Sequence, residues 1–252
     1  MTAFNRDTEY LALDFDGVIA DSIAECLVNG YNAHVRFEGE GDPITRLSDL
    51  APAVVDEARR LRNFIRSGQD YVYIFQAIRQ GADLRDQSGF DRFAQAHRDR
   101  RDPYFDLFYQ VRKHAADSDP AGWAELSPLY PGMGEFLTSF PEDRLTIVTT
   151  KKAEYAAIIL SHNDVRIGED RIFQATEAHP KQDILVRLAE NRGVAPSVFC
   201  FVDDQVDTLF NIRPTGVRCF LAEWGYNNSD QVARAWEHGV SVLSLKAFFD
   251  RF

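Results

Sequence analysis

Cysteine is scarce in this chain, and the few cysteines that it has stand far apart. They are Cys26, Cys200 and Cys219. Three scattered thiols are too few for a disulfide framework and lack the paired spacing of a zinc site. The sequence therefore predicts reduced, buried thiols in a cytoplasmic protein.

Long apolar runs are also missing. No run is long enough to cross a bilayer. The first ten residues, MTAFNRDTEY, lack the basic-then-apolar pattern of a secretion signal. We therefore expect no membrane partner, and a chain of 252 residues that is 45% hydrophobic can bury a sizeable core.

The chain also lacks an excess of basic residues. The formal net charge of −11 argues against general nucleic-acid binding, which needs a basic face. Residues 46–114 differ from the rest, because they contain 13 Lys/Arg and 10 Asp/Glu. A locally basic segment on an acidic body would suit an anionic substrate, and a solvated helical surface of mixed charge is an equally good interpretation.

Short apolar runs separated by helical patterns make up much of the sequence. Runs without strict alternation are typical of strands covered on both faces of a parallel sheet. Helical patterns occupy residues 152–162 and 181–193, and Gly193 marks the end of the second. This order predicts an α/β fold with a doubly wound, parallel, Rossmann-like sheet. The expected strands are residues 10–15, 144–150, 171–176, 197–204 and 216–223.

The segment between the first two expected strands has a different pattern. Residues 22–126 contain no strand pattern, and their apolar residues recur at helical spacing. Asp102 and Pro103 indicate the start of one of these helices. We therefore expect a core domain of residues 1–21 and 127–252 and an inserted helical domain of residues 22–126.

Acids and hydroxyls follow three of the expected strands. The carboxyl ends of parallel strands meet at one edge of a sheet, which is where ligands bind in open α/β folds. Several carboxylates gathered there would repel one another, and a divalent cation would relieve that repulsion. Oxygen ligands without His or Cys favour Mg²⁺. The residues are Asp14, Asp16, Thr149, Thr150, Asp203, Asp204 and Asp207.

Taken together, these motifs resemble the haloacid dehalogenase superfamily of phosphohydrolases. The motifs are DFDGVIADS from Asp14, IVTTK around Thr149, Lys181 at a helix start, and FVDDQVD around Asp204. PLYPGMGEFL at 128–137 is similar to the return from a helical cap, and WGY at 224–226 to a loop of phosphoglycolate-phosphatase-like members. The resemblance covers residues 10–22 and about 128–245, and it implies that the inserted helical domain is a cap.

The resemblance also implies roles for the site residues. Asp14 would be the nucleophile that forms an aspartyl-phosphate, and Asp16 the general acid and base. Thr149, Thr150 and Lys181 would bind the phosphate. Mg²⁺ would be held by Asp14, by the backbone carbonyl of Asp16 and by an acid of the fourth motif.

The fourth motif departs from the family pattern, which has Gly-Asp where this chain has Asp203-Asp204. Asp204 is the favoured metal ligand and Asp203 the alternative. Asp207 is expected behind the ligands, orienting a loop N–H or a metal-bound water. In the third motif, Gln182 follows Lys181 where the family usually has proline.

The predicted function is a Mg²⁺-dependent phosphatase that acts on a small phosphorylated metabolite. Asp16 argues against a 2-haloacid dehalogenase or a phosphonate-cleaving enzyme, which lack Asp at that position. A phosphomutase on the same core is one alternative, and a non-catalytic ligand-binding or regulatory protein is another. The substrate's identity and the oligomeric state stay open.

The helical domain contains two further sets of residues that bear on substrate binding. The first holds candidate contacts, which are otherwise exposed helix residues: His34, Arg36, Arg62, Arg66 and Arg79. The second holds aromatic residues that we interpret as domain core rather than as a base-stacking site. They are Tyr71, Tyr73, Phe75, Tyr104, Phe105, Phe108 and Tyr109.

Overall fold

Two compact units make up the structure. A computed structural model describes residues 4–252. The first unit ends at Asp21 and resumes at Pro128–Phe252, and the second unit is Ser22–Ser127. These limits lie within one residue of the domain boundaries expected from the sequence.

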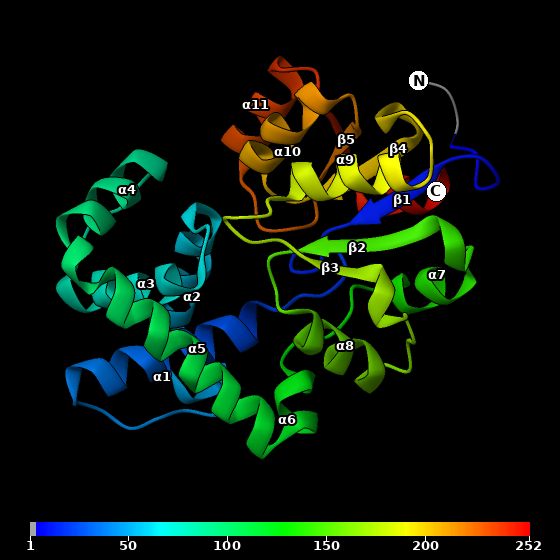
Figure 1. Cartoon of the computed structure of the whole chain (residues 1–252). Helices are drawn as coiled ribbons and strands as arrows, with labels where there is room; N and C mark the ends of the chain where they lie inside the picture. The colour runs from blue at the N-terminus through cyan, green and yellow to red at the C-terminus, as the bar shows by residue number, and fades with distance from the viewer. Residues whose placement is uncertain (1–3) are drawn as a thin grey trace. The chain divides into compact units, whose positions relative to one another are not determined.

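The first unit is built on one sheet in the order β3-β2-β1-β4-β5-β6, and every neighbouring pair is parallel. Figure 1 shows β3, β2, β1, β4 and β5 side by side. The non-consecutive order and the intervening helices confirm the predicted doubly wound α/β fold. The strands are β1 (Tyr10–Leu13), β2 (Leu145–Thr149), β3 (Ile172–Gln174), β4 (Phe199–Asp203), β5 (Arg218–Ala222) and β6 (Ser241–Leu243).

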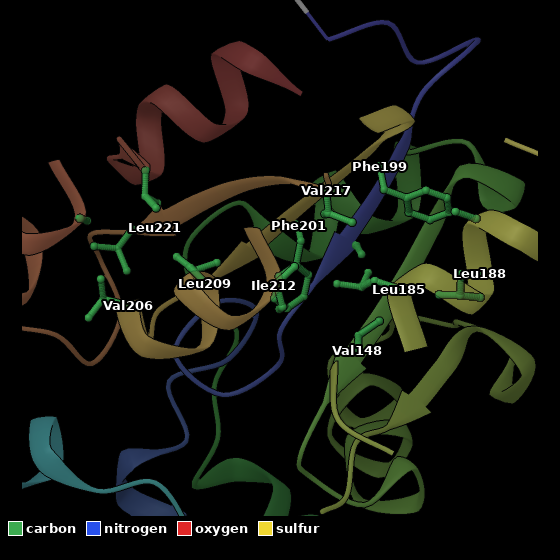
Figure 2. Close-up of a cluster of buried hydrophobic side chains, with 14 residues drawn as sticks. Val148, Leu185, Leu188, Phe199, Phe201, Val206, Leu209, Ile212, Val217 and Leu221 are labelled. Atoms are coloured by element: carbon green, nitrogen blue, oxygen red, sulfur yellow. The ribbon is translucent and has the colours of Figure 1, made fainter. Parts of the chain in front are cut away.

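Helices cover both faces of this sheet because alternate strand side chains point to opposite sides. On one face, Phe199 and Phe201 of β4 pack into a buried cluster with side chains of α9, α10 and α11, which Figure 2 shows in part. The unit's helices are α7 (Met133–Ser139), α8 (Ala153–His162), α9 (Lys181–Asn191), α10 (Val206–Ile212), α11 (Ser229–Glu237) and α12 (Leu245–Arg251).

The opposite face includes a group of aromatic contacts. Phe136 of α7 and Phe248 of α12 have ring centroids 4.8 Å apart. Phe220 of β5 contacts Phe252 at the C-terminus, with centroids 5.6 Å apart. Aromatic pairs at such distances add to the free energy of burial, so this face anchors the last helix onto the sheet.

The expected strands are present, each shortened by two or three residues. The run expected at 197–204, for example, is β4, and the residues before it form a 3₁₀ turn at Pro196–Val198. The sequence did not predict β6, α11 or α12. The strand β6 has only three residues, two of them half-buried, so it lacks the apolar run that marks the others.

The second unit is entirely helical, as expected, and residues 22–127 contain no strand. Tyr104 and Phe108 of α5 are fully buried, and Tyr71 stacks on Phe108 with centroids 5.5 Å apart. Phe105, in contrast, is 41% exposed. The helices are α1 (Ile23–Glu38), α2 (Pro52–Leu61), α3 (Gly68–Gln80), α4 (Gln87–Ala96), α5 (Arg101–Ser118) and α6 (Pro120–Glu125).

Most of the predicted aromatic core of this unit is confirmed by burial. The buried members are Tyr71, Tyr73, Phe75, Tyr104 and Phe108. Asp102 and Pro103 lie in the first turn of α5, which begins one residue earlier than expected, at Arg101.

The cysteines are free thiols. Cys26 and Cys200 are buried and Cys219 is partly buried. Burial raises the pKa of Cys200 and of Cys219 to about 12, so both stay protonated at neutral pH. Within residues 4–252, no helix is long and apolar enough to cross a membrane.

Candidate active site

Two acids lie side by side where β1 and β4 end. In the register of these strands, Leu13 is opposite Val202, and the N–H of Asp14 continues the ladder by donating to the Val202 carbonyl at 2.9 Å. Asp14 is therefore the neighbour of Asp203, the last residue of β4. Both are buried, Asp14 at 6% exposure and Asp203 at 0%.

Lys181 lies between these two acids. Its Nζ is 2.9 Å from Asp14 Oδ2 and 2.7 Å from Asp203 Oδ2. Lys181 is the first residue of α9 and is itself buried. The remaining oxygens accept from the backbone, Asp14 Oδ1 from the Phe15 N–H and Asp203 Oδ1 from the Gln205 N–H. One buried ammonium group thus bridges two buried carboxylates.

Burial and charge shift the pKa values of this group in opposite directions. Burial raises the pKa of Asp14 to about 6, against the lowering effect of Lys181, and the neighbouring Asp203 adds to the rise. Burial lowers the pKa of Lys181, but Asp14 and Asp203 outweigh it, and the net pKa lies above the ordinary value. Lys181 therefore stays protonated.

Asp204 approaches the same edge of the sheet from the turn after β4. Its Oδ2 accepts from the Tyr226 N–H at 2.8 Å. Gly17 packs against it with a φ of +84°, and a Cβ on Gly17 would lie 2.3 Å from Asp204 Oδ2. A Cβ on Gly225 would lie 2.4 Å from Asp204 Cβ. Only glycine fits at Gly17 and Gly225 without displacing the carboxylate.

Three of the predicted acids form a group that suits a cation. One carboxylate oxygen from each of Asp14, Asp203 and Asp204 lies within 4.8 Å of the others. Lys181 contacts two of the three. The donors are all oxygen atoms and carry an excess of negative charge, which fits Mg²⁺ by donor chemistry and charge.

Asp16 has a different partner, which the sequence did not identify. Its Oδ1 lies 3.2 Å from Nζ of Lys151, a residue whose side chain is 0% exposed. The Lys151 N–H also donates to Thr149 Oγ1 at 3.1 Å. In the sequence, only its position just after the Thr149-Thr150 pair distinguishes Lys151. The neighbouring Lys152 is marked in the same way, so the sequence could not choose between the two lysines.

Two other predicted site residues depart from expectation. Thr150 is exposed, whereas Thr149, the last residue of β2, is buried. Asp207 is not in the group of three acids. It lies in the first turn of α10, where its Oδ1 accepts from Arg234 Nη2 of α11 at 2.8 Å. An exposed arginine thus neutralises Asp207, which was expected to support the metal ligands.

Within the helical unit, the candidate substrate contacts differ in environment. Arg36 is exposed, while Arg66 and Arg79 form ion pairs with carboxylates of their own unit. Arg62 is buried, with its guanidinium carbon 5.5 Å from the centre of the Tyr71 ring. His34 is also buried.

Comparison with known proteins gave matches in structure and none in sequence. A scan against protein-family models found no match, and neither did a search of curated proteins. A haloacid dehalogenase-like family hydrolase from Streptococcus pneumoniae has 14% identity and a TM-score of 0.57, with 97% of both chains covered.

Two further solved structures are similar to this chain. A predicted phosphoglycolate phosphatase from Haemophilus somnus has 17% identity and a TM-score of 0.56, with 93% of this chain and 92% of that chain covered. A haloacid dehalogenase family hydrolase from Deinococcus radiodurans, with bound phosphate and sodium, has 14% identity and a TM-score of 0.57, with 97% and 94% covered. These likenesses confirm the predicted resemblance at the level of the fold.

Proposed function

We propose that this protein is a Mg²⁺-dependent phosphatase that hydrolyses a small phosphorylated metabolite through an aspartyl-phosphate. The observation that carries the proposal is the buried contact of Asp14 with Lys181, which also contacts Asp203. Buried carboxylates that outnumber their cationic partners are costly to maintain, and binding a phosphoryl group with its metal explains why they are there. The phosphatase and hydrolase descriptions of similar structures support the same reaction class.

In the first step, an oxygen of Asp14 attacks phosphorus and forms a P–O bond. The bond from phosphorus to the ester oxygen breaks, its electron pair leaves with that oxygen, and Asp16 donates the proton that makes the leaving alcohol. Thr149 Oγ1 already accepts from the Lys151 N–H, so its own O–H is oriented to donate to a phosphate oxygen. Lys181 neutralises phosphate charge.

In the second step, the Asp16 carboxylate takes a proton from water as the water oxygen attacks phosphorus. The bond between phosphorus and the Asp14 oxygen breaks, which releases inorganic phosphate and regenerates the Asp14 carboxylate. Atoms and protons balance, because the proton taken from water restores the acid form of Asp16 for the next cycle. A phosphomutase would instead return the phosphoryl group to a sugar hydroxyl.

Asp14 and Asp204 would hold the metal with their side chains, and Asp16 with its backbone carbonyl. Asp204 is preferred to Asp203 because Asp203 stands where the resembling family has glycine in the fourth motif. When bound, Mg²⁺ would supply positive charge that lowers the repulsion between the phosphate and these carboxylates.

The proposal is tested by hydrolysis of p-nitrophenyl phosphate with Mg²⁺, by the unmodified protein and by Asp14→Asn. Asp14→Asn keeps the shape of the side chain and removes the attacking charge, so we expect activity to fall by about 10³-fold or more with the fold retained. Asp207→Asn is the matched control and should retain most activity. Lack of turnover by the unmodified protein across a panel of phosphate esters would favour a binding protein.

A further inference from the structure

We propose that Lys151 is a positioning residue that holds the carboxyl group of Asp16 for proton transfer. The inference rests on the proposed function, since it concerns the group that acts as acid and base. The geometry behind it is one contact, Lys151 Nζ to Asp16 Oδ1 at 3.2 Å, made by a lysine whose side chain is fully buried.

Full burial is unusual for lysine and requires a compensating charge. An ammonium group removed from water loses its hydration, and pairing with a carboxylate offsets that cost. The next residue shows the ordinary arrangement, because the Lys152 side chain is 44% exposed and lies 3.7 Å from Glu154. Two adjacent lysines of the same loop thus have opposite environments, and only Lys151 faces a predicted catalytic group.

The contact also distinguishes the two oxygens of Asp16. Oδ1 is buried and, among the described residues, accepts no hydrogen bond, although the Lys151 ammonium faces it at ion-pair distance. The Asp16 side chain is 19% exposed, so this exposure falls on its other atoms. Lys151 therefore fixes Oδ1 on the protein side and leaves Oδ2 to exchange the proton with the substrate oxygen and with water.

Lys151 further connects two functional groups through one residue. Its side chain faces Asp16, and its backbone N–H holds the hydroxyl oxygen of Thr149. The phosphate-binding hydroxyl and the proton-transfer carboxyl group come from strands that are far apart in the sequence. Lys151 thus sets their relative position, and a side chain without a charge at residue 151 would leave Asp16 free to rotate.

The experiment tests the proposed acid role of Asp16 by comparing the rates of two esters with different leaving groups. Phenyl phosphate and p-nitrophenyl phosphate have similar shapes, but only phenoxide needs a proton to leave easily. Release of each phenol is measured in single turnover, with Mg²⁺ present and enzyme in excess, so that hydrolysis of the aspartyl-phosphate does not contribute. The variants are Lys151→Met, Lys151→Gln, Asp16→Asn, Asp16→Asn combined with Lys151→Met, and the control Lys152→Met.

For Lys151→Met we expect a loss that is at least about tenfold larger for phenyl phosphate than for p-nitrophenyl phosphate, since a misplaced acid mainly affects the poorer leaving group. Asp16→Asn should show the same selective loss, and Lys151→Met added to Asp16→Asn should cause no further selectivity. Lys152→Met should leave both rates unchanged. If Lys151→Met does not fold, Lys151→Gln answers the same question with a polar side chain of similar length.

Two outcomes would overturn different roles, that of Lys151 in positioning and that of Asp16 as the acid. Equal losses on both esters for the Lys151 variants, together with a selective loss for Asp16→Asn, would overturn the positioning role and leave the proposed function intact. Equal losses for Asp16→Asn itself would remove the acid role of Asp16, and with it the basis of the inference.

Discussion

Each unit buries charge, but the two units differ in how that charge is balanced. In the helical unit, Glu25 is 0% exposed and is matched by Arg112, whose Nε and Nη2 lie 2.8 and 3.0 Å from its two oxygens. Asn29 and Trp123 donate to the same carboxylate. In the α/β unit, the buried carboxylates of Asp14, Asp203 and Asp204 lie within 4.8 Å of one another, and Lys181 pairs with the first two.

This difference separates a structural ion pair from a candidate site. A buried carboxylate with a bidentate arginine and further donors is satisfied, so it needs no ligand. A group of carboxylates with too few cations is stable only because the fold holds it, and a cation or phosphate ligand improves its energy. Each variant below changes a residue of only one of the two units.

Removal of the arginine from the balanced pair should have the largest effect on stability. Arg112→Met leaves Glu25 buried without its cation, so we expect a loss of about 3–5 kcal/mol in the free energy of unfolding. Urea denaturation followed by circular dichroism measures it. Lys113→Met is the control, because Lys113 is 65% exposed and its pair with Asp117 should contribute less than about 1 kcal/mol. Equal stabilities for the two variants would contradict the comparison.

Removal of one acid from the unbalanced group should act in the opposite direction. The pKa of Asp14 is raised from 3.8 to about 6 in the folded protein. The free energy of unfolding therefore falls as the pH rises through this window and Asp14 becomes ionised. Asp14→Asn removes that cost. In EDTA at pH 7 we expect it to be more stable than the unmodified protein by about 1–3 kcal/mol, measured by urea denaturation. A clear loss of stability would show that Lys181 needs both carboxylates.

The choice between Asp203 and Asp204 can be decided by metal affinity. Asp204→Ala should weaken Mg²⁺ binding, measured by titration calorimetry, by about tenfold or more, because it removes a direct ligand. Asp207→Ala should change it by about threefold or less, since Asp207 pairs with Arg234 at 39% exposure. Weak Mg²⁺ binding by Asp203→Asn together with normal Mg²⁺ binding by Asp204→Ala would show that Asp203, and not Asp204, is the metal ligand.

The smallest expected effect concerns His34 in the helical unit. Burial lowers its pKa, Glu38 opposes the shift, and Arg79 and Arg100 add to it. The unfolded chain then binds the proton more readily, so stability is lost as the pH falls below about 6.5. His34→Gln should remove about 1 kcal/mol or less of the stability difference between pH 7 and pH 5 in urea denaturation. His114→Gln, an exposed histidine of α5, should leave that difference unchanged.

The sequence by itself determined five of the six strands of the sheet and the main acids of the site. Apolar runs such as 197–204 have no stable place except between two layers of helices, and the acids that follow them must lie at the carboxyl edge of the sheet. Asp14 and Asp203 are adjacent for that reason.

Only the tertiary structure decided which of several similar residues turns toward the site. Lys151 and Lys152 are neighbours of the same type, and Asp203, Asp204 and Asp207 follow one strand. Their directions depend on contacts with residues far away in sequence: Lys151 with Asp16, Asp204 with the Tyr226 N–H, and Asp207 with Arg234. Local propensity is the same for both lysines, so the partner that compensates a buried charge selects the orientation, and that partner is known only once the chain is folded.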